Sequence, residues 1–77
     1  MKKLYAYKTK VGVFYIMERE GRFHPVFQEQ SLGIYLTPQQ AVDDLVGGRT
    51  ISLPGGIDIT TLGIPPDLGD WERRVTS

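Results

Sequence analysis

The 77-residue chain carries nine basic and nine acidic side chains, no cysteine and a formal net charge of zero. This length predicts one domain that buries only about 60% of its extended-chain surface, and the lack of cysteine excludes disulfide bonds and thiolate metal sites. The run Met1-Lys2-Lys3 leads into alternating tyrosines and lysines rather than a long apolar stretch. We therefore expect no export signal, no membrane span and a cytoplasmic location.

Three strands are expected in the first third of the chain: Leu4 to Thr9, Gly12 to Glu18 and Arg22 to Phe27. The second is the richest in β-branched and aromatic residues, so it should be the central strand. A short turn joins the first two strands, and a polar hairpin loop in which Gly21 adopts a positive φ joins the second to the third. Pro25 lacks a backbone N-H, which predicts an edge position or a bulge for the third strand.

The central strand is apolar on both faces. Successive side chains of a strand point to opposite sides, which places Phe14 and Ile16 on one face and Val13, Tyr15 and Met17 on the other. If a helix covers one face, something else must cover the second. The candidates are the C-terminal third of the chain or a second protein molecule.

A short helix is the clearest element of the sequence. It should follow a short strand over Leu32 to Leu36 and begin at Thr37 as the N-cap, with Pro38 at the first helical position and Gln40 completing a capping box. Gly47-Gly48 supplies the left-handed residue that commonly ends a helix. One narrow side of the helix is apolar and should lie on the sheet: Ala41, Val42, Leu45 and Val46. Leu36 and Ala41 should form a hydrophobic staple.

The C-terminal third is apolar without a regular pattern. Thr50 to Leu53 has the composition of a short strand, and residues 57–64 should lie along the sheet in an irregular path. Pro66 favours one or two turns of helix that place Leu68 and Trp71 on the same side, with Trp71 anchoring the tail.

Together these elements predict a single small α+β domain over residues 1–77. We expect an antiparallel sheet of three or four strands, one main α-helix packed on it, and an extended C-terminal tail that closes the other side. The expected core consists of Phe14, Ile16, Phe23, Phe27, Leu32, Ala41, Leu45 and Trp71.

Charge is unevenly distributed along the chain. Basic residues dominate the first third, whereas acidic residues dominate the middle and later parts until Arg73 and Arg74 restore the balance. Such asymmetry is compatible with a basic face for nucleic acid, but we favour the interpretation that the two halves pack together and their surface charges complement each other.

No residues form a trustworthy catalytic, cofactor-binding or metal site. His24 is the only histidine, which excludes multi-histidine metal sites and histidine pairs. Asp43 and Asp44 are adjacent, so on a helix they point about 100° apart and cannot chelate a metal without further ligands. The Gly47-Gly48 and Gly55-Gly56 pairs lack the Gly-Lys-Ser/Thr ending of a phosphate loop. A convergence of His24, Asp43 and Tyr35 in a cleft would reopen the case for an enzyme.

A series of short motifs spans nearly the whole chain: Gly12 to Phe14, Ser31 to Tyr35, Thr37 to Leu45, Gly47-Gly48, Asp58 to Leu68 and Trp71. In order and spacing these motifs resemble a family of small uncharacterised bacterial proteins, mostly proteobacterial. The family has no assigned activity, cofactor or catalytic residue, so the resemblance implies no site. Gly69 stands where a polar residue is expected, which weakens the short helix before Trp71.

The leading functional hypothesis is a small non-enzymatic protein-interaction module of a bacterial cytoplasm, which contacts an unidentified protein through a sheet edge or a remaining apolar patch. The alternative is a nucleic-acid-associated protein. Tyr5, Tyr7 and Tyr15 lie near Lys8 and Lys10 on the expected strands, a mixture that can stack single-stranded nucleic acid. We expect no cofactor and no membrane contact, and the oligomeric state stays open.

Overall fold

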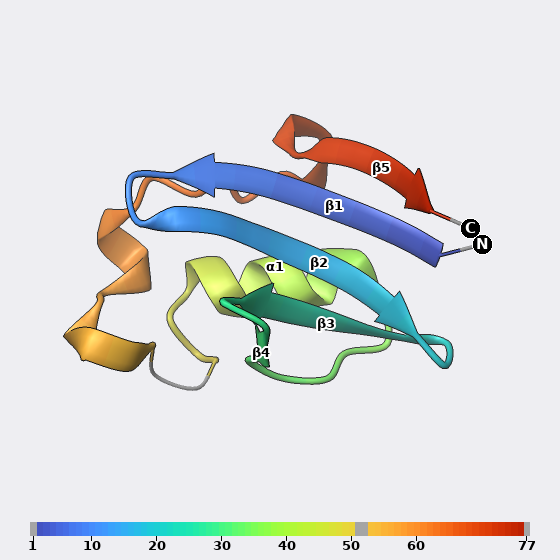
Figure 1. Cartoon of the computed structure of the whole chain (residues 1–77), viewed down its shortest axis with the longest axis horizontal. Helices are drawn as coiled ribbons and strands as arrows, with labels where there is room; N and C mark the ends of the chain where they lie inside the picture. Colours follow the sequence, from blue (N-terminus) through green and yellow to red (C-terminus); the bar gives the residue numbers. More distant parts are fainter. Residues whose placement is uncertain (1, 51–52, 77) are drawn as a thin grey trace.

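The computed structural model describes residues 2–50 and 53–76 and has the predicted α+β fold (Figure 1). Its sheet has five strands in the order β4-β3-β2-β1-β5, each antiparallel to its neighbours. The strands are β1 (Lys2–Thr9), β2 (Gly12–Arg19), β3 (Arg22–Phe27), β4 (Gln30–Ser31) and β5 (Glu72–Thr76). One α-helix, α1 (Pro38–Val46), lies behind the sheet, and three short 3₁₀ turns follow it: η1 (Pro54–Gly56), η2 (Ile59–Thr61) and η3 (Leu68–Asp70).

The first three strands form as predicted, with β2 at the centre of the sheet. Glu20 and Gly21 both have positive φ, 53° and 75°, as a tight two-residue hairpin turn requires. The carbonyl of Pro25 accepts a hydrogen bond from Leu32 N at 2.7 Å on the β4 side of the strand. The side of Pro25 that lacks a donor therefore faces the two-residue strand β4 and not β2. The prediction of an edge position or a bulge for the third strand is wrong, because β3 lies between β4 and β2 and its register with β2 is regular. The proline is tolerated because β4 pairs only with Val26 and Phe27 and needs no N-H from Pro25.

The start of α1 follows the predicted capping pattern with one change. The Thr37 hydroxyl accepts from Gln40 N at 3.1 Å, and Pro38 occupies the first helical position. In a capping box the Gln40 side chain accepts from the backbone N-H of the cap residue, Thr37. Here it accepts instead from Leu36 N at 3.3 Å, one residue before the cap. The expected staple between Leu36 and Ala41 is wrong, because Leu36 is 62% exposed whereas Ala41 is buried. The cap hydrogen bonds alone fix the entry of the chain into α1.

The end of α1 is a Schellman motif centred on Gly48, whose φ is 71°. Arg49 N donates to Asp44 O at 2.8 Å, and Gly48 N donates to Leu45 O at 3.2 Å. These two bonds satisfy carbonyls that would otherwise have no partner at the helix end. The prediction that Gly47-Gly48 supplies the left-handed residue is confirmed at Gly48.

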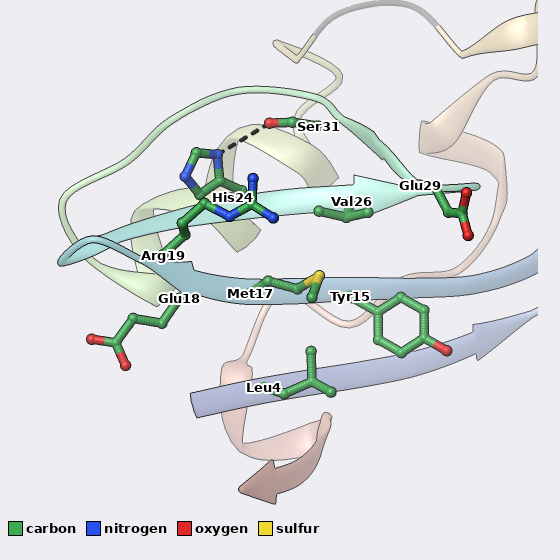
Figure 2. A pocket seen from close by; sticks show the side chains of 9 residues that line it. All are labelled: Leu4, Tyr15, Met17, Glu18, Arg19, His24, Val26, Glu29 and Ser31. Atoms are coloured by element: carbon green, nitrogen blue, oxygen red, sulfur yellow. Dashed lines mark hydrogen bonds between the residues drawn. The ribbon is translucent and has the colours of Figure 1, made fainter. Parts of the chain in front are cut away.

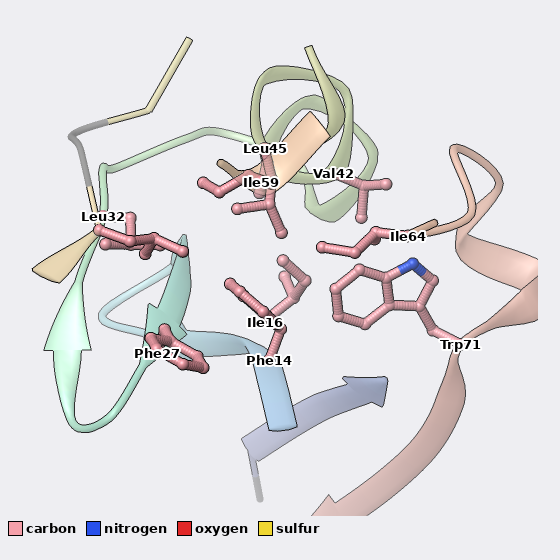
Figure 3. Packing of buried hydrophobic residues seen from close by; sticks show 11 residues of the cluster. Phe14, Ile16, Phe27, Leu32, Val42, Leu45, Ile59, Ile64 and Trp71 are labelled. Carbon is pink, nitrogen blue, oxygen red and sulfur yellow. The ribbon is translucent and has the colours of Figure 1, made fainter. Parts of the chain in front are cut away.

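A single hydrophobic cluster fills the space between the sheet and α1 (Figure 3). The rings of Phe14 and Phe27 stack at a centroid distance of 4.4 Å, a geometry that adds to the stabilisation from burial. The buried members are Phe14, Ile16, Phe27, Leu32, Ala41, Val42, Leu45, Leu53, Ile59, Ile64 and Trp71, with Phe23 half-buried against them. The predicted core residues are therefore all in or against this cluster.

The prediction that the C-terminal tail closes the other side of the sheet is wrong. Ile59, Ile64 and Trp71 belong to the same cluster as α1, so the tail packs on the helix side. The physical reason is the length of α1, because a helix of nine residues is too short to cover a five-stranded sheet. The tail fills the remaining space on that face and then adds β5 beside β1.

Trp71 anchors the tail, as predicted. Its side chain is only 4% exposed, its ring centroid lies 5.8 Å from that of Tyr7, and its indole N-H donates to Pro65 O at 3.2 Å. The helical turn expected before it is the 3₁₀ turn η3, in which the Asp67 carboxylate accepts from Gly69 N at 2.9 Å.

Two further strand predictions differ from the structure. The strand expected over Leu32 to Leu36 is displaced, because β4 ends at Ser31 and only Tyr35 then pairs with Phe23, as an isolated bridge. The strand expected over Thr50 to Leu53 includes residues 51–52, which lie outside the described residues.

Candidate functional site

The face of the sheet turned away from α1 is apolar, and no segment of residues 2–50 or 53–76 packs over it (Figures 1 and 2). The strand register places apolar side chains from three adjacent strands on this open face: Leu4, Ala6, Val13, Tyr15, Met17 and Val26. Met17, near their centre, is 37% exposed. The open face is therefore an apolar surface that the sequence expects to be covered and that the described residues leave uncovered.

A groove of about 410 Å³ runs over the open face. Figure 2 shows Leu4, Tyr15, Met17 and Val26 along it, with His24 toward one end and Glu29 at the other. Its full lining is Leu4, Tyr15, Met17, Glu18, Arg19, His24, Val26, Glu29 and Ser31. This volume lies within the range of about 300–1,000 Å³ that is typical of binding pockets.

His24 and Ser31 form a hydrogen bond at one edge of the groove, 3.1 Å between Nδ1 and Oγ. The Ser31 hydroxyl donates its only proton to Gly33 O at 3.0 Å, so Nδ1 of His24 must be the donor to Oγ. A serine nucleophile instead donates to its histidine base. The pair ties β3 to β4, and the serine hydroxyl is engaged by Gly33 O as well as by His24.

His24, Asp43 and Tyr35 do not converge. His24 lies on the open face, in register with Met17, whereas Asp43 is exposed on α1 and accepts from Gln39 Nε2 at 2.9 Å. Tyr35 packs against the core cluster on the helix side of the sheet. The structure therefore does not assemble the cleft that would reopen the case for an enzyme.

Asp44 is the centre of a small polar cluster at the end of α1. Arg49 Nε lies 3.0 Å from Asp44 Oδ1, and this hydrogen bond, followed by one from Tyr35, holds the pKa of the Asp44 carboxyl below its usual range. Burial, with a smaller contribution from the bond to Asp44, raises the pKa of Tyr35. Among the described residues, no group of three or more His, Asp or Glu side chains is arranged to hold a metal ion.

The tyrosines proposed for nucleic-acid stacking lie on different faces. Tyr5 and Tyr7 pack against the core cluster on the helix side, whereas Tyr15 lines the groove of the open face. Base stacking along a strand of nucleic acid requires successive aromatic rings on one surface. The structure does not place these three side chains on a common platform.

Charge is unevenly distributed between the two sides of the sheet. The register places the exposed side chains Lys8, Arg19 and Arg22 on the open face, where Arg74 is paired with Glu72 at 3.1 Å. The layer of α1 and the tail carries most of the acidic residues: Asp43, Asp44, Asp58, Asp67 and Asp70. The ion pairs of Arg49 with Asp44 and of Arg74 with Glu72 each lie within the later part of the chain. These two ion pairs do not join the first third of the chain to the rest.

Comparisons of this chain with protein-family models, with curated proteins and with solved structures found no match. The resemblance to small uncharacterised bacterial proteins therefore stays a prediction. In the part of the chain that the structure describes, no helix combines the length and the apolar content needed to cross a bilayer.

Proposed function

We propose that this protein is a small non-enzymatic interaction module that binds another protein through the open face of its sheet. The observation that carries the proposal is the uncovered apolar face itself. The sequence leaves the C-terminal third or a second protein molecule as its cover, and the C-terminal third packs on the helix side. A partner protein is the remaining candidate. The lack of cysteine is compatible with a reducing cytoplasm as the place of action.

The energetics support binding at this face. Fully burying one large apolar side chain stabilises a complex by about 1.5–3 kcal/mol relative to leaving it exposed. Tyr15 and Met17 lie side by side along the groove with Leu4 and Val26 flanking them. Met17 is 37% exposed and the other three are half-buried, so covering them recovers only part of that energy. A partner must bury apolar side chains of its own in the groove to offset the loss of its translational and rotational freedom, which costs about 4–15 kcal/mol.

Affinity capture with matched variants tests the proposal. The tagged protein, Met17→Glu and Ile34→Glu are used to capture proteins from a lysate of the source, with and without nuclease. Ile34 is 66% exposed in the segment between β4 and α1 and does not line the groove, so Ile34→Glu matches the loss of an exposed apolar side chain outside the groove. Circular dichroism checks that both variants are folded.

We expect the wild type and Ile34→Glu to capture the same protein in comparable amounts, with or without nuclease. Met17→Glu should capture at least about tenfold less of it, because burying an unpaired carboxylate is costly. Equal capture by Met17→Glu would contradict the proposal. Loss of every partner on nuclease treatment would favour nucleic acid instead, and an empty capture in all samples would also count against the module.

A further inference from the structure

We infer that the protein seated on the open face is a second copy of this chain, packed face to face about a two-fold axis. This inference rests on the proposed function and names the partner. It is carried by opposite charges at the two ends of the groove, by a match between two neighbouring rows of side chains, and by the size of the face.

The groove carries opposite charges at its two ends. Arg19 lies toward one end and Glu29 lies at the other (Figure 2). Glu18 also lines the Arg19 end, but its register partner Phe23 packs on the helix side, so the strand position of Glu18 belongs to that side. A lining with both signs selects neither an acidic nor a basic partner. A copy of the same surface, turned end for end, brings each end over its opposite.

Two neighbouring rows of side chains cross the open face on β5, β1, β2 and β3. The register gives the first row as Arg74, Leu4, Met17 and His24, and the second row as Glu72, Ala6, Tyr15 and Val26. We place a two-fold axis between two facing sheets, perpendicular to the strands and midway between these rows. This axis lays the first row of each copy over the second row of the other.

The contacts that this axis creates are complementary. Met17 of one copy meets Tyr15 of the other, and a thioether against an aromatic ring is a favourable contact. Arg74 meets Glu72 of the other copy, and these two exposed side chains already pair at 3.1 Å within one chain. Because the interface is symmetric, each contact is made twice.

The same axis brings the charged ends together. Arg19 lies two residues beyond Met17 on β2, with Arg22 as its register partner on β3, and Glu29 lies in the turn after β3 at the other end of the groove. The two arginines of one copy therefore lie over the Glu29 end of the other. Lys8 is also exposed at that end, but it lies on β1, about 10 Å or two strand spacings from the turn.

The face is large enough for a dimer interface. The Cα atoms extend over 33 × 20 × 20 Å, and the sheet lies broadside in the view down the shortest axis (Figure 1). Such a face is comparable in area to the roughly 800 Å² per partner that a standard specific interface buries. Two twisted sheets pack in this way about 10 Å apart, with strands aligned within about 30°. The layer of α1 and the tail then lies on the outside of each copy.

Sedimentation and a filtered NMR experiment test the inference. Sedimentation equilibrium of the full-length protein between about 1 µM and 1 mM measures the dissociation constant of the dimer. For the contact, protein that is deuterated except for ¹³C-labelled methionine methyl groups is mixed with an equal amount of unlabelled protein. An NOE from the Met17 methyl group to the Tyr15 ring then arises only between two chains. We expect a dimer and this NOE.

Exchanging the charges tests the two-fold arrangement. Arg19→Glu and Glu29→Arg should each weaken the dimer at least about tenfold, because each brings like charges together at two symmetric positions. An equal mixture of the two variants should recover the dimer, because the mixed dimer has opposite charges at both positions. Arg73→Glu is the matched control, because Arg73 is exposed and its register partner Tyr5 packs on the helix side. The control should change the dissociation constant by less than about twofold at physiological salt.

A monomer over the whole concentration range would overturn the inference, and so would a dimer without the NOE between Met17 and Tyr15. A mixture of Arg19→Glu and Glu29→Arg that stays as weak as either variant alone would overturn the two-fold arrangement. In each of these cases, a different protein captured by the wild type and lost on Met17→Glu would leave the interaction module intact. Equal capture of that protein by Met17→Glu would instead reject the module itself.

Discussion

Trp71 holds the tail to the sheet through two separate interactions. Its ring packs against Tyr7 inside the core cluster, and its indole N-H binds Pro65 O across a short loop. Position and composition were enough to predict this role, because the only tryptophan of a small chain supplies a large share of the apolar surface that can be buried. The hydrogen bond to Pro65 was not predictable, since it depends on the path of the loop between the two residues.

Shortening Trp71 should therefore be costly. We predict that Trp71→Ala lowers the free energy of unfolding by about 3–5 kcal/mol, which is most of the stability of a chain of this size. Trp71→Phe should lose only about 1–2 kcal/mol, because it keeps an aromatic ring against Tyr7 but loses the hydrogen bond. Urea unfolding followed by circular dichroism measures both. A loss below about 1 kcal/mol for Trp71→Ala would show that the tail is not anchored there.

Asp44 links the acid stability of the protein to the end of α1. The hydrogen bond from Arg49 holds the pKa of Asp44 below its usual range in the folded protein, so the unfolded chain binds a proton at this carboxyl at higher pH than the folded chain does. The resulting stabilisation is present above the ordinary aspartate pKa, about 3.9, and is lost as the pH falls through the folded value.

We predict that Arg49→Gln raises the pKa of Asp44 toward that ordinary value. A ¹³C carboxyl NMR titration of wild type and variant measures the shift. In the acid range, the free energy of unfolding of Arg49→Gln should depend less on pH than that of the wild type. An unchanged Asp44 titration in Arg49→Gln would contradict the assignment of the shift to this hydrogen bond.

At the scale of elements, α1 was predictable because its signals are local. The cap at Thr37, the proline at the first position and the left-handed Gly48 each act within one or two turns of chain. β5 was missed because a strand such as Glu72–Thr76 forms only through pairing with β1, about 70 residues earlier in the chain. Nothing in its own sequence distinguishes that pairing from a mobile tail.

The turn between β3 and β4 has a backbone that its residues do not favour. Gln28 and Glu29 have φ values of 51° and 64°, a region that glycine and asparagine adopt more readily. The sequence consequently gives a weak hairpin signal here, which explains why the predicted strand was placed after residue 31 rather than at Gln30–Ser31. The same turn places Glu29 at the end of the groove.

Relieving this turn should stabilise the protein. We predict that Gln28→Asn combined with Glu29→Gly raises the free energy of unfolding by about 1 kcal/mol, because the strain of two left-handed residues outweighs the added flexibility of the unfolded chain. Thermal unfolding measures the change. Lys10→Gly is the matched control, because Lys10 lies in the turn between β1 and β2 and has no positive φ. It should give no gain in the free energy of unfolding. A decrease in stability on relieving the β3 to β4 turn would refute this account of its backbone.

At the scale of the whole molecule, the sequence predicted two apolar faces but not which segment covers which face. The alternation of Phe14 and Ile16 with Tyr15 and Met17 follows from the geometry of one strand. Whether the tail joins the helix side depends on how much of that side α1 leaves uncovered, a quantity set by the whole packed structure. The groove was likewise not predictable, because Ser31 and Glu29 reach it only through the turn that follows β3.

The resulting molecule has an apolar open face bordered by charged side chains of both signs, and most of its acidic residues lie in the layer of α1 and the tail. Affinity for a partner then follows from burial of the apolar side chains of the open face. The central claim is that the open face is covered by another protein.

The most direct test is the methionine methyl spectrum of the labelled protein with and without the fraction captured from its source. The chain has only two methionines, Met1 and Met17, so the spectrum is simple and Met17 reports on the open face. We predict that the Met17 signal shifts or broadens when the captured fraction is added, and that Ile34→Glu behaves in the same way. A Met17 signal that stays unchanged while the captured protein binds would show that the partner contacts some other surface, and would contradict the claim.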